Sequence, residues 1–118
     1  MIDVESKLNS LSKSKFRSRF HLNSKMKESC KEKGYKEIRK HAYVFINERL
    51  KDENPKNDGK QTPMKGHPVF IAQHACACCC RSCLYKWHHI EKNKELTSNE
   101  INYIVSVLMK WIELQIKE

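Results

Sequence analysis

Apolar residues recur every three or four positions near the end of the chain, and this is the clearest pattern in the sequence. Such spacing predicts an amphipathic helix that buries one face. Thr97 and Glu100 stand just before the pattern at the spacing of a capping box, a pair that bonds to the first backbone amides of a helix. We therefore expect a structural helix to begin at this box, with a core face formed by Ile101, Ile104, Val105, Leu108, Ile112 and Ile116.

Residues 35–51 carry a second helical pattern, with mainly basic residues on the face opposite the apolar one. Its apolar face consists of Ile38, Ala42, Phe45, Ile46 and Leu50. Gly34 is expected to end any helix that precedes it. Turn-forming residues between 54 and 59 end the pattern, and a loop is expected from there to Gly66. Loops of this length in a small domain are often functional.

Two short helices are expected in the middle of the chain. Pro68 suits the first position of a helix, and the apolar residues 69–71 follow it on a helix that carries His74. A second short helix is predicted from Arg81 to His89. The sequence between them is rich in cysteine, so these two helices bracket the part of the chain with the most chemistry.

The composition narrows the fold class. The chain has 118 residues, enough for one domain, and only three glycines and three prolines, too few for the recurrent turns of an all-β fold. We predict an all-α fold with one small domain of four to five helices over residues 16–118 and a Cys/His-rich helix–elbow–helix in its middle. Residues 1–15 are expected to form a polar, basic N-terminal segment, for which loose order is one interpretation.

The chemical state expected of the six cysteines depends on the cellular compartment of the protein. The start of the chain lacks the apolar region of a signal peptide, and no run of about 18 apolar residues could cross a membrane. We therefore expect a cytoplasmic protein, in which cysteines are more often thiols or metal ligands than disulfides. Five of the six fall within eight positions, from Cys76 to Cys83.

The net charge of +9 is unevenly distributed, because residues 1–65 contain 17 Lys/Arg and 9 Asp/Glu. A basic half of a chain suggests nucleic acid or another anionic partner. The competing interpretation is a lysine-rich composition without a partner, since arginine is the preferred phosphate and base contact. Phe16 and Phe20 alternate with cations in residues 13–20 and either lie on a phosphate backbone or, as we favour, dock a short helix on the core.

Residues 67–89 suggest a metal site. Cys80 and Cys83 form a C-x2-C pair, a spacing that lets two thiolates reach one ion. We predict one zinc ion bound by His74, Cys80, Cys83 and His88, with Cys79 or His67 as the alternate ligands. On one continuous helix His74 and Cys83 would face opposite sides, so this set requires a break in the chain near residues 76–80.

Two other interpretations use the same residues. Cysteine packs well as a small apolar residue, so the cluster could belong to a metal-free structural or interaction protein. The protein could also be an enzyme, either a metal-dependent hydrolase with an open zinc position or a cysteine-based catalyst that uses the 57–67 loop. The candidate catalytic residues are Asp58, Lys60, His67, Cys79 and Arg81, with Arg81 beside the thiol as the cation that lowers its pKa.

Several motifs resemble a known family. They are Phe16–Leu22 (Phe-Arg-Ser-Arg-Phe-His-Leu), Arg39–Ala42, Asn57–Met64, Gly66–Phe70, Gln73–Ala75, Cys79–Arg81 with Cys83, and Lys86–His88. Together they resemble the bacterial family called Domain of Unknown Function number 4186 over nearly the whole chain. The resemblance implies no reaction, because the family brings no established activity.

The resemblance does sharpen the choice of residues. It implies threonine at the positions of Cys76 and Cys78 and glycine at that of His89, so these three are local departures. Asp58, Lys60 and Gln61 fall within a matching motif, which favours a binding or catalytic role for the 57–67 loop. Four convergent ligands would favour a metal-stabilised binding module, whereas three ligands would favour an enzyme.

Overall fold

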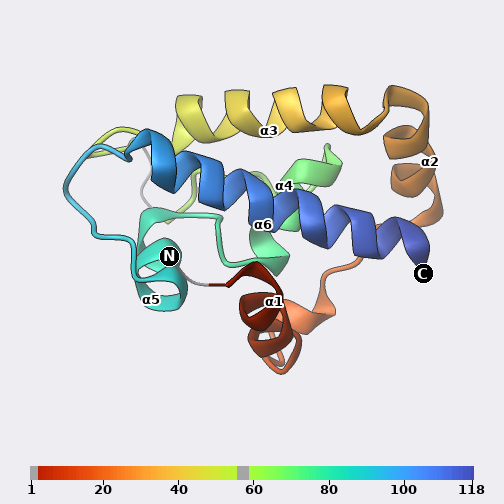
Figure 1. Cartoon of the computed structure of the whole chain (residues 1–118), viewed down its shortest axis with the longest axis horizontal. Helices are drawn as coiled ribbons and strands as arrows, with labels where there is room; N and C mark the ends of the chain where they lie inside the picture. The colour runs from red at the N-terminus through yellow and green to blue at the C-terminus, as the bar shows by residue number, and fades with distance from the viewer. Residues whose placement is uncertain (1–2, 56–58) are drawn as a thin grey trace.

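Helices account for all the regular structure of residues 3–55 and 59–118, the part of the chain that the computed structural model describes (Figure 1). The elements are α1 Val4–Ser12, a turn of 3-10 helix η1 Arg17–Arg19, α2 Ser24–Lys33, α3 Tyr35–Arg49, α4 Pro68–Ala75, α5 Arg81–His88 and α6 Ser98–Lys117. The all-α prediction is confirmed. The predicted count of four to five helices is too low, because six α-helices form in the described residues.

The two helices that raise the count are polar, and this is why the hydrophobic pattern did not reveal them. Leu11 is the buried residue of α1, and Cys30 is the buried residue of α2. Each helix begins at an N-cap side chain: Asp3 accepts a hydrogen bond from the Ser6 amide, and Asn23 from the Met26 amide. Helix α1 lies within the predicted N-terminal segment and packs against α6.

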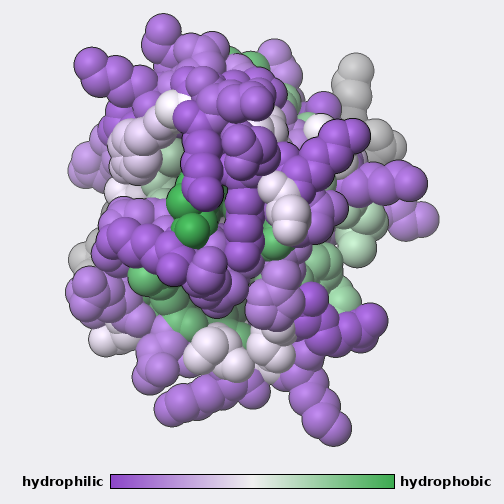
Figure 2. All heavy atoms as spheres, turned by 90° about the vertical axis from the view of Figure 1, so that its right-hand side faces the viewer, coloured by the Kyte–Doolittle hydropathy of each residue, from purple (hydrophilic) through white to green (hydrophobic). Residues whose placement is uncertain are grey.

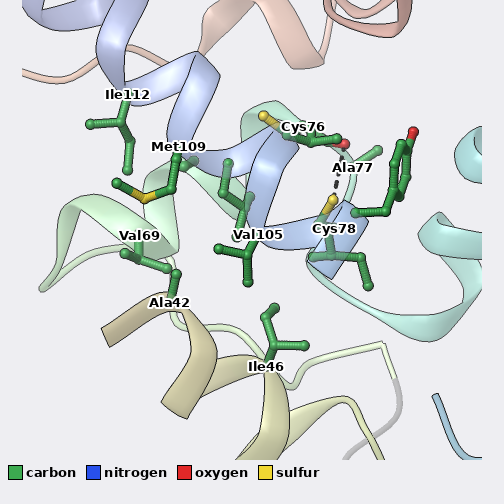
Figure 3. Packing of buried hydrophobic residues seen from close by; sticks show 14 of the residues in the cluster. Ala42, Ile46, Val69, Cys76, Ala77, Cys78, Val105, Met109 and Ile112 are labelled. Carbon is green, nitrogen blue, oxygen red and sulfur yellow. Dashed lines mark hydrogen bonds between the residues drawn. The ribbon is translucent and has the colours of Figure 1, made fainter. Parts of the chain in front are cut away.

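Helix α6 forms the centre of the core and packs against α3, α4 and α1 (Figure 1). The capping box predicted at its start is present, since Thr97 Oγ1 accepts from the Glu100 amide and Glu100 Oε1 from the Thr97 amide. Figure 3 shows the packing among its central residues and their neighbours, Ala42, Ile46, Val69, Val105, Met109 and Ile112. None of the described helices is both long enough and apolar enough to cross a membrane.

The predicted break between α4 and α5 is also present. Residues 76–80 form an elbow in which Ala77 adopts the left-handed conformation, with φ 57°. Cys76 and Cys78 are fully buried in the core beside this turn, where the Cys78 sulfur points to the Cys76 carbonyl (Figure 3). The elbow therefore sends two of its cysteines into the core and leaves Cys79 and Cys80 at the start of α5.

Candidate metal centre

Three sulfur atoms converge where the elbow meets α5. The Sγ atoms of Cys79, Cys80 and Cys83 all lie within 4.8 Å of one another. The Cys83 sulfur is 3.3 Å from that of Cys80 and 3.6 Å from that of Cys79. Sulfurs bound at about 2.3 Å to one tetrahedral zinc ion would be about 3.8 Å apart. The three thiols are therefore already arranged much like one face of such a site.

The start of α5 explains why these sulfurs meet. Cys80 is the N-cap residue, and its extended backbone (φ −157°, ψ 168°) turns its side chain back over the first turn of the helix. There its sulfur accepts a hydrogen bond from the backbone amide of Cys83, at 3.4 Å. A C-x2-C pair thus occupies the N-cap and third helical positions, where unpaired amides favour negative charge.

Arg17 supplies a positive charge to the same group. Its guanidinium donates to the sulfurs of Cys83, at 3.1 Å, and Cys79, at 3.6 Å. It also donates to the His74 carbonyl oxygen at 2.7 Å, and the residue is only 8% exposed. Sequence reasoning did not identify Arg17 as a site residue, although it lies in the Phe16–Leu22 motif. Its place in that motif was the signal that the sequence offered. Spacing could not reveal its contacts, because the side-chain partners of Arg17 lie 57 or more positions away along the chain.

The short helix around Arg17 docks as favoured above, but through one of its two aromatics. The ring of Phe20 stacks on His74, with 5.5 Å between ring centroids and 18° between planes. Phe16 contacts the edge of Phe20 and remains 48% exposed. Docking of Phe20 on α4 therefore positions η1, and with it the guanidinium that covers the thiols.

The thiols stay protonated when no cation is bound, because they lie close together and are partly buried. The pKa of Cys83 is raised by its hydrogen bond with Cys79; burial adds to this, and Arg17 opposes it. The pKa of Cys79 is raised by its hydrogen bond with Cys80, and burial again adds to the effect. Three thiolates this close would repel one another, so a bound divalent cation would replace the protons.

The two histidines predicted as zinc ligands lie in other hydrogen bonds. His74 Nε2 is 3.1 Å from the Pro63 carbonyl oxygen and 3.2 Å from that of Thr62. His88 Nε2 is 2.7 Å from the Cys76 carbonyl oxygen. Because a carbonyl only accepts, each of these nitrogens carries its hydrogen and has no lone pair for a metal. His88 Nδ1 is 2.7 Å from the Tyr103 hydroxyl, and among the described residues neither ring nitrogen of His74 or His88 joins the three sulfurs within 4.8 Å. The set of His74, Cys80, Cys83 and His88 therefore stays a prediction that requires both rings to turn.

His67, the other alternate ligand, lies at the opposite end of α4 from the cysteines. As N-cap of α4 it accepts a hydrogen bond from the Val69 amide through Nδ1, so its Nε2 donates to His41 Nδ1 at 2.9 Å. Burial lowers the pKa of His67 to about 4, with His41 and Lys33 adding to the effect. Its observed position makes it a helix cap rather than a neighbour of the sulfurs.

The loop before α4 is fastened to the elbow. Thr62 Oγ1 donates to the Cys79 carbonyl at 2.8 Å. The buried Gln73 amide donates to Thr62 Oγ1 and to the Cys78 carbonyl. Lys60 is exposed, and Asp58 lies outside the described residues. The part of the loop that the structure describes therefore positions the cysteine backbone, and it does so mainly through Thr62.

Arg81 has a different environment from the one expected beside a reactive thiol. Its side chain is 1% exposed, and its guanidinium donates to four carbonyl oxygens at 2.7–3.0 Å. These belong to Leu50, Asp52, Glu91 and Lys94. Arg81 thus joins the end of α3 to the segment before α6, and Arg17 is the guanidinium that contacts the sulfurs.

Comparison with known proteins identifies the family but no known fold. No solved structure matches the chain. The family model described as "Domain of unknown function (DUF4186)" matches residues 5–113, a range that contains Arg17 and all three converging cysteines. The chain therefore belongs to the DUF4186 family, as its motifs indicated.

Proposed function

We propose that the protein is a small helical metal-binding module in which Cys79, Cys80 and Cys83 hold one thiophilic ion, zinc in the first place. The observation that carries the proposal is the convergence of three sulfurs within 4.8 Å. Thiolate sulfur suits zinc and other soft ions, and not magnesium or calcium. Cys79, an alternate ligand in the sequence analysis, becomes one of the three principal ligands.

The charge of Arg17 supports this assignment. Zn²⁺ with three thiolates would carry a net charge of −1, and a guanidinium that donates to two of the sulfurs would balance it. Arg17 is nearly buried, and its charge is stabilised best by an anionic partner. Three bound thiolates provide that partner without the mutual repulsion that they would have in the absence of the ion.

The number of sulfurs bears on the role of the metal. Three protein ligands leave one position for water, a partner's side chain or a fourth protein ligand such as His74 after its ring has turned. Three thiolates also donate much negative charge to zinc, which weakens its ability to activate water. We therefore favour a binding module over a metal-dependent hydrolase. The hydrolase remains the second candidate because three protein ligands leave one position open for water.

Metal content tests the proposal directly. Protein purified anaerobically without chelators is analysed by elemental mass spectrometry, together with the variants Cys79→Ser, Cys80→Ser and Cys83→Ser. We expect about one zinc per wild-type chain and at least a tenfold weaker affinity in each variant, because each removes one of few ligands. Cobalt substitution should give thiolate-to-metal charge-transfer bands that weaken in the same variants.

Cys30→Ser is the matched control, since Cys30 is a buried cysteine on α2, outside the sulfur cluster. It should keep the metal. His74→Gln tests the remaining position: loss of metal there would indicate that this histidine turns to complete the site. Wild-type protein without metal, which also fails to bind added zinc, would overturn the proposal, provided that circular dichroism shows a folded chain.

A further inference from the structure

We propose that Cys83 and Cys80 form a reversible disulfide by exchange with the disulfides of small thiols. The inference goes beyond the metal site. It concerns the same sulfurs in the metal-free protein, and it does not depend on the metal proposal being correct. It makes the start of α5 a site of covalent modification, with a low-molecular-weight disulfide as the reacting class of compound.

The geometry is close to that of the bonded state. The two sulfurs are 3.3 Å apart, and a disulfide bond is about 2.0 Å long, so closure requires an approach of about 1.3 Å. Cys80 lies outside the helical backbone, in an extended conformation, and can supply this movement by side-chain rotation. Cys79 is the competing partner, at 3.6 Å from the Cys83 sulfur.

Exposure and charge point to Cys83 as the thiol that reacts first. Its sulfur lies close to both other sulfurs and is the nearer of the two that Arg17 contacts. The Arg17 guanidinium lies 3.1 Å from the Cys83 sulfur, where it would stabilise the negative charge that this sulfur carries as it attacks. Cys83 is partly exposed, whereas Cys80 is 6% exposed. A small disulfide would therefore meet Cys83 first, and Cys80 would resolve the product.

The exchange is balanced in two steps. The Cys83 thiolate attacks one sulfur of the small disulfide, so that a mixed disulfide forms and one small thiolate leaves. The Cys80 sulfur then attacks the Cys83 sulfur and expels the second small thiolate. The two protons from the protein thiols pass to the two leaving thiolates. The protein is oxidised by two electrons, and one disulfide is reduced to two thiols.

The position of the pair favours a reversible bond over a structural one. The bond would close a loop of only four residues, from Cys80 to Cys83, and so would remove little entropy from the unfolded chain. The remaining thiols are protected by burial, since Cys76 and Cys78 are fully buried and Cys30 is 3% exposed. Exchange should therefore be confined to the three sulfurs at the start of α5.

The sequence offers a direct assay. Trypsin cleaves after Arg81, which lies between the two cysteines, and separates residues 66–81 from residues 82–86. The second peptide contains Cys83 as its one cysteine, so a disulfide to it links the two peptides. Folded wild-type protein is treated with oxidised glutathione and a metal chelator, alkylated, digested and analysed by mass spectrometry. We expect the linked peptides as the main product, with four alkylated thiols per chain.

Matched variants identify the partner. Cys83→Ser should give no linked peptides, Cys79→Ser should still give them, and Cys80→Ser should slow their formation at least tenfold relative to Cys79→Ser. Accumulation of unresolved glutathione at Cys83, or six unmodified thiols after treatment, would overturn the proposal. Loss of the link in Cys79→Ser but not in Cys80→Ser would overturn the assigned pair.

Adding zinc before the oxidant separates this inference from the metal proposal. Protection by zinc is expected if both hold. A disulfide that forms equally fast with zinc would count against the metal site and leave the exchange intact. Protein that binds zinc but never forms the link would leave the metal site and overturn the exchange.

Discussion

Arg17 and Arg81 show how one residue type serves two purposes in this small domain. Both guanidiniums are almost fully buried. Arg17 donates to two sulfurs and one carbonyl, whereas Arg81 donates to four carbonyls. The forked, planar guanidinium can satisfy several acceptors at once. The difference lies in the acceptors: sulfur can bind an ion or be oxidised, but a backbone carbonyl here only holds loops in place.

Replacement of Arg81 should therefore destabilise the whole domain. Arg81→Met keeps the length of the side chain but leaves four carbonyl oxygens without their donor, which should cost about 2–4 kcal/mol. Urea unfolding followed by circular dichroism measures the loss. Lys86→Met, at an exposed position of the same helix, is the control and should change stability by less than about 0.5 kcal/mol. Equal stabilities for the two variants would contradict the role of Arg81 in joining the end of α3 to the segment before α6.

Spacing along the chain explains which site residues the sequence could predict. Cys80 and Cys83 meet within one turn of one helix, so their C-x2-C spacing contains the geometry. The contact between Arg17 and Cys83 spans 66 positions and depends on how η1 packs against α4. The hydrogen bonds of the His74 ring likewise depend on where the loop at Thr62 and Pro63 lies. No local pattern carries that information.

Among the helices, those that the sequence predicted bury more residues than those that it did not. Helices α3, α4 and α5 begin at the residues predicted for them, and α3 and α5 end within two residues of their predicted ends. Helix α6 begins at its predicted capping box. Helices α1 and α2 bury one residue each and begin with a single capping side chain. For them, tertiary packing decides helix formation more than the local pattern does.

The end of α5 provides a test at this scale. His89 is exposed and adopts the left-handed conformation (φ 57°), which glycine adopts without strain. His89→Gly should therefore raise the free energy of unfolding by about 1 kcal/mol, measured by urea denaturation. His89→Ala is the control and should give no gain, because alanine keeps the Cβ atom. A loss of stability in the glycine variant would show that the His89 side chain has a structural contact of its own.

At the scale of the whole molecule, the net charge is +9. Figure 2 views the end formed by α2 and the C-terminal part of α6, where hydrophilic side chains dominate and hydrophobic groups show in small areas. The surplus of lysine and arginine in residues 1–65 suggests an anionic partner such as nucleic acid, with a lysine-rich composition as the competing interpretation, and that partner remains a prediction. Its binding should weaken steeply with salt if phosphate contacts are involved.

Acid should destabilise the domain before its carboxylates titrate. Burial lowers the pKa of His88 and of His67 to about 4, whereas histidine in an unfolded chain titrates near 6.5. The unfolded state thus binds protons first, and stability falls as the pH drops from about 6.5 towards 4. In chelator and reductant, the free energy of unfolding should be lower at pH 5 than at pH 7.5 by about 2 kcal/mol from His88 alone, with a further loss from His67.

His88→Gln serves as the comparison for this prediction. The glutamine amide can still donate to the Cys76 carbonyl but does not titrate, so the loss between the two pH values should shrink. His21→Gln, at an exposed position, should keep most of the dependence. A pH dependence that is the same in wild type and His88→Gln would show that this buried imidazole is not responsible.

The reach of Arg17 across the chain also has a consequence for the order of folding. Its hydrogen bonds close loops of 57–66 residues, and such long loops form late, after local helices have appeared. During synthesis, η1 leaves the ribosome well before α5. When the thiols emerge, the Arg17 guanidinium has not yet docked on them. The nascent chain therefore passes through an interval in which helix is already present but the cysteines are uncovered.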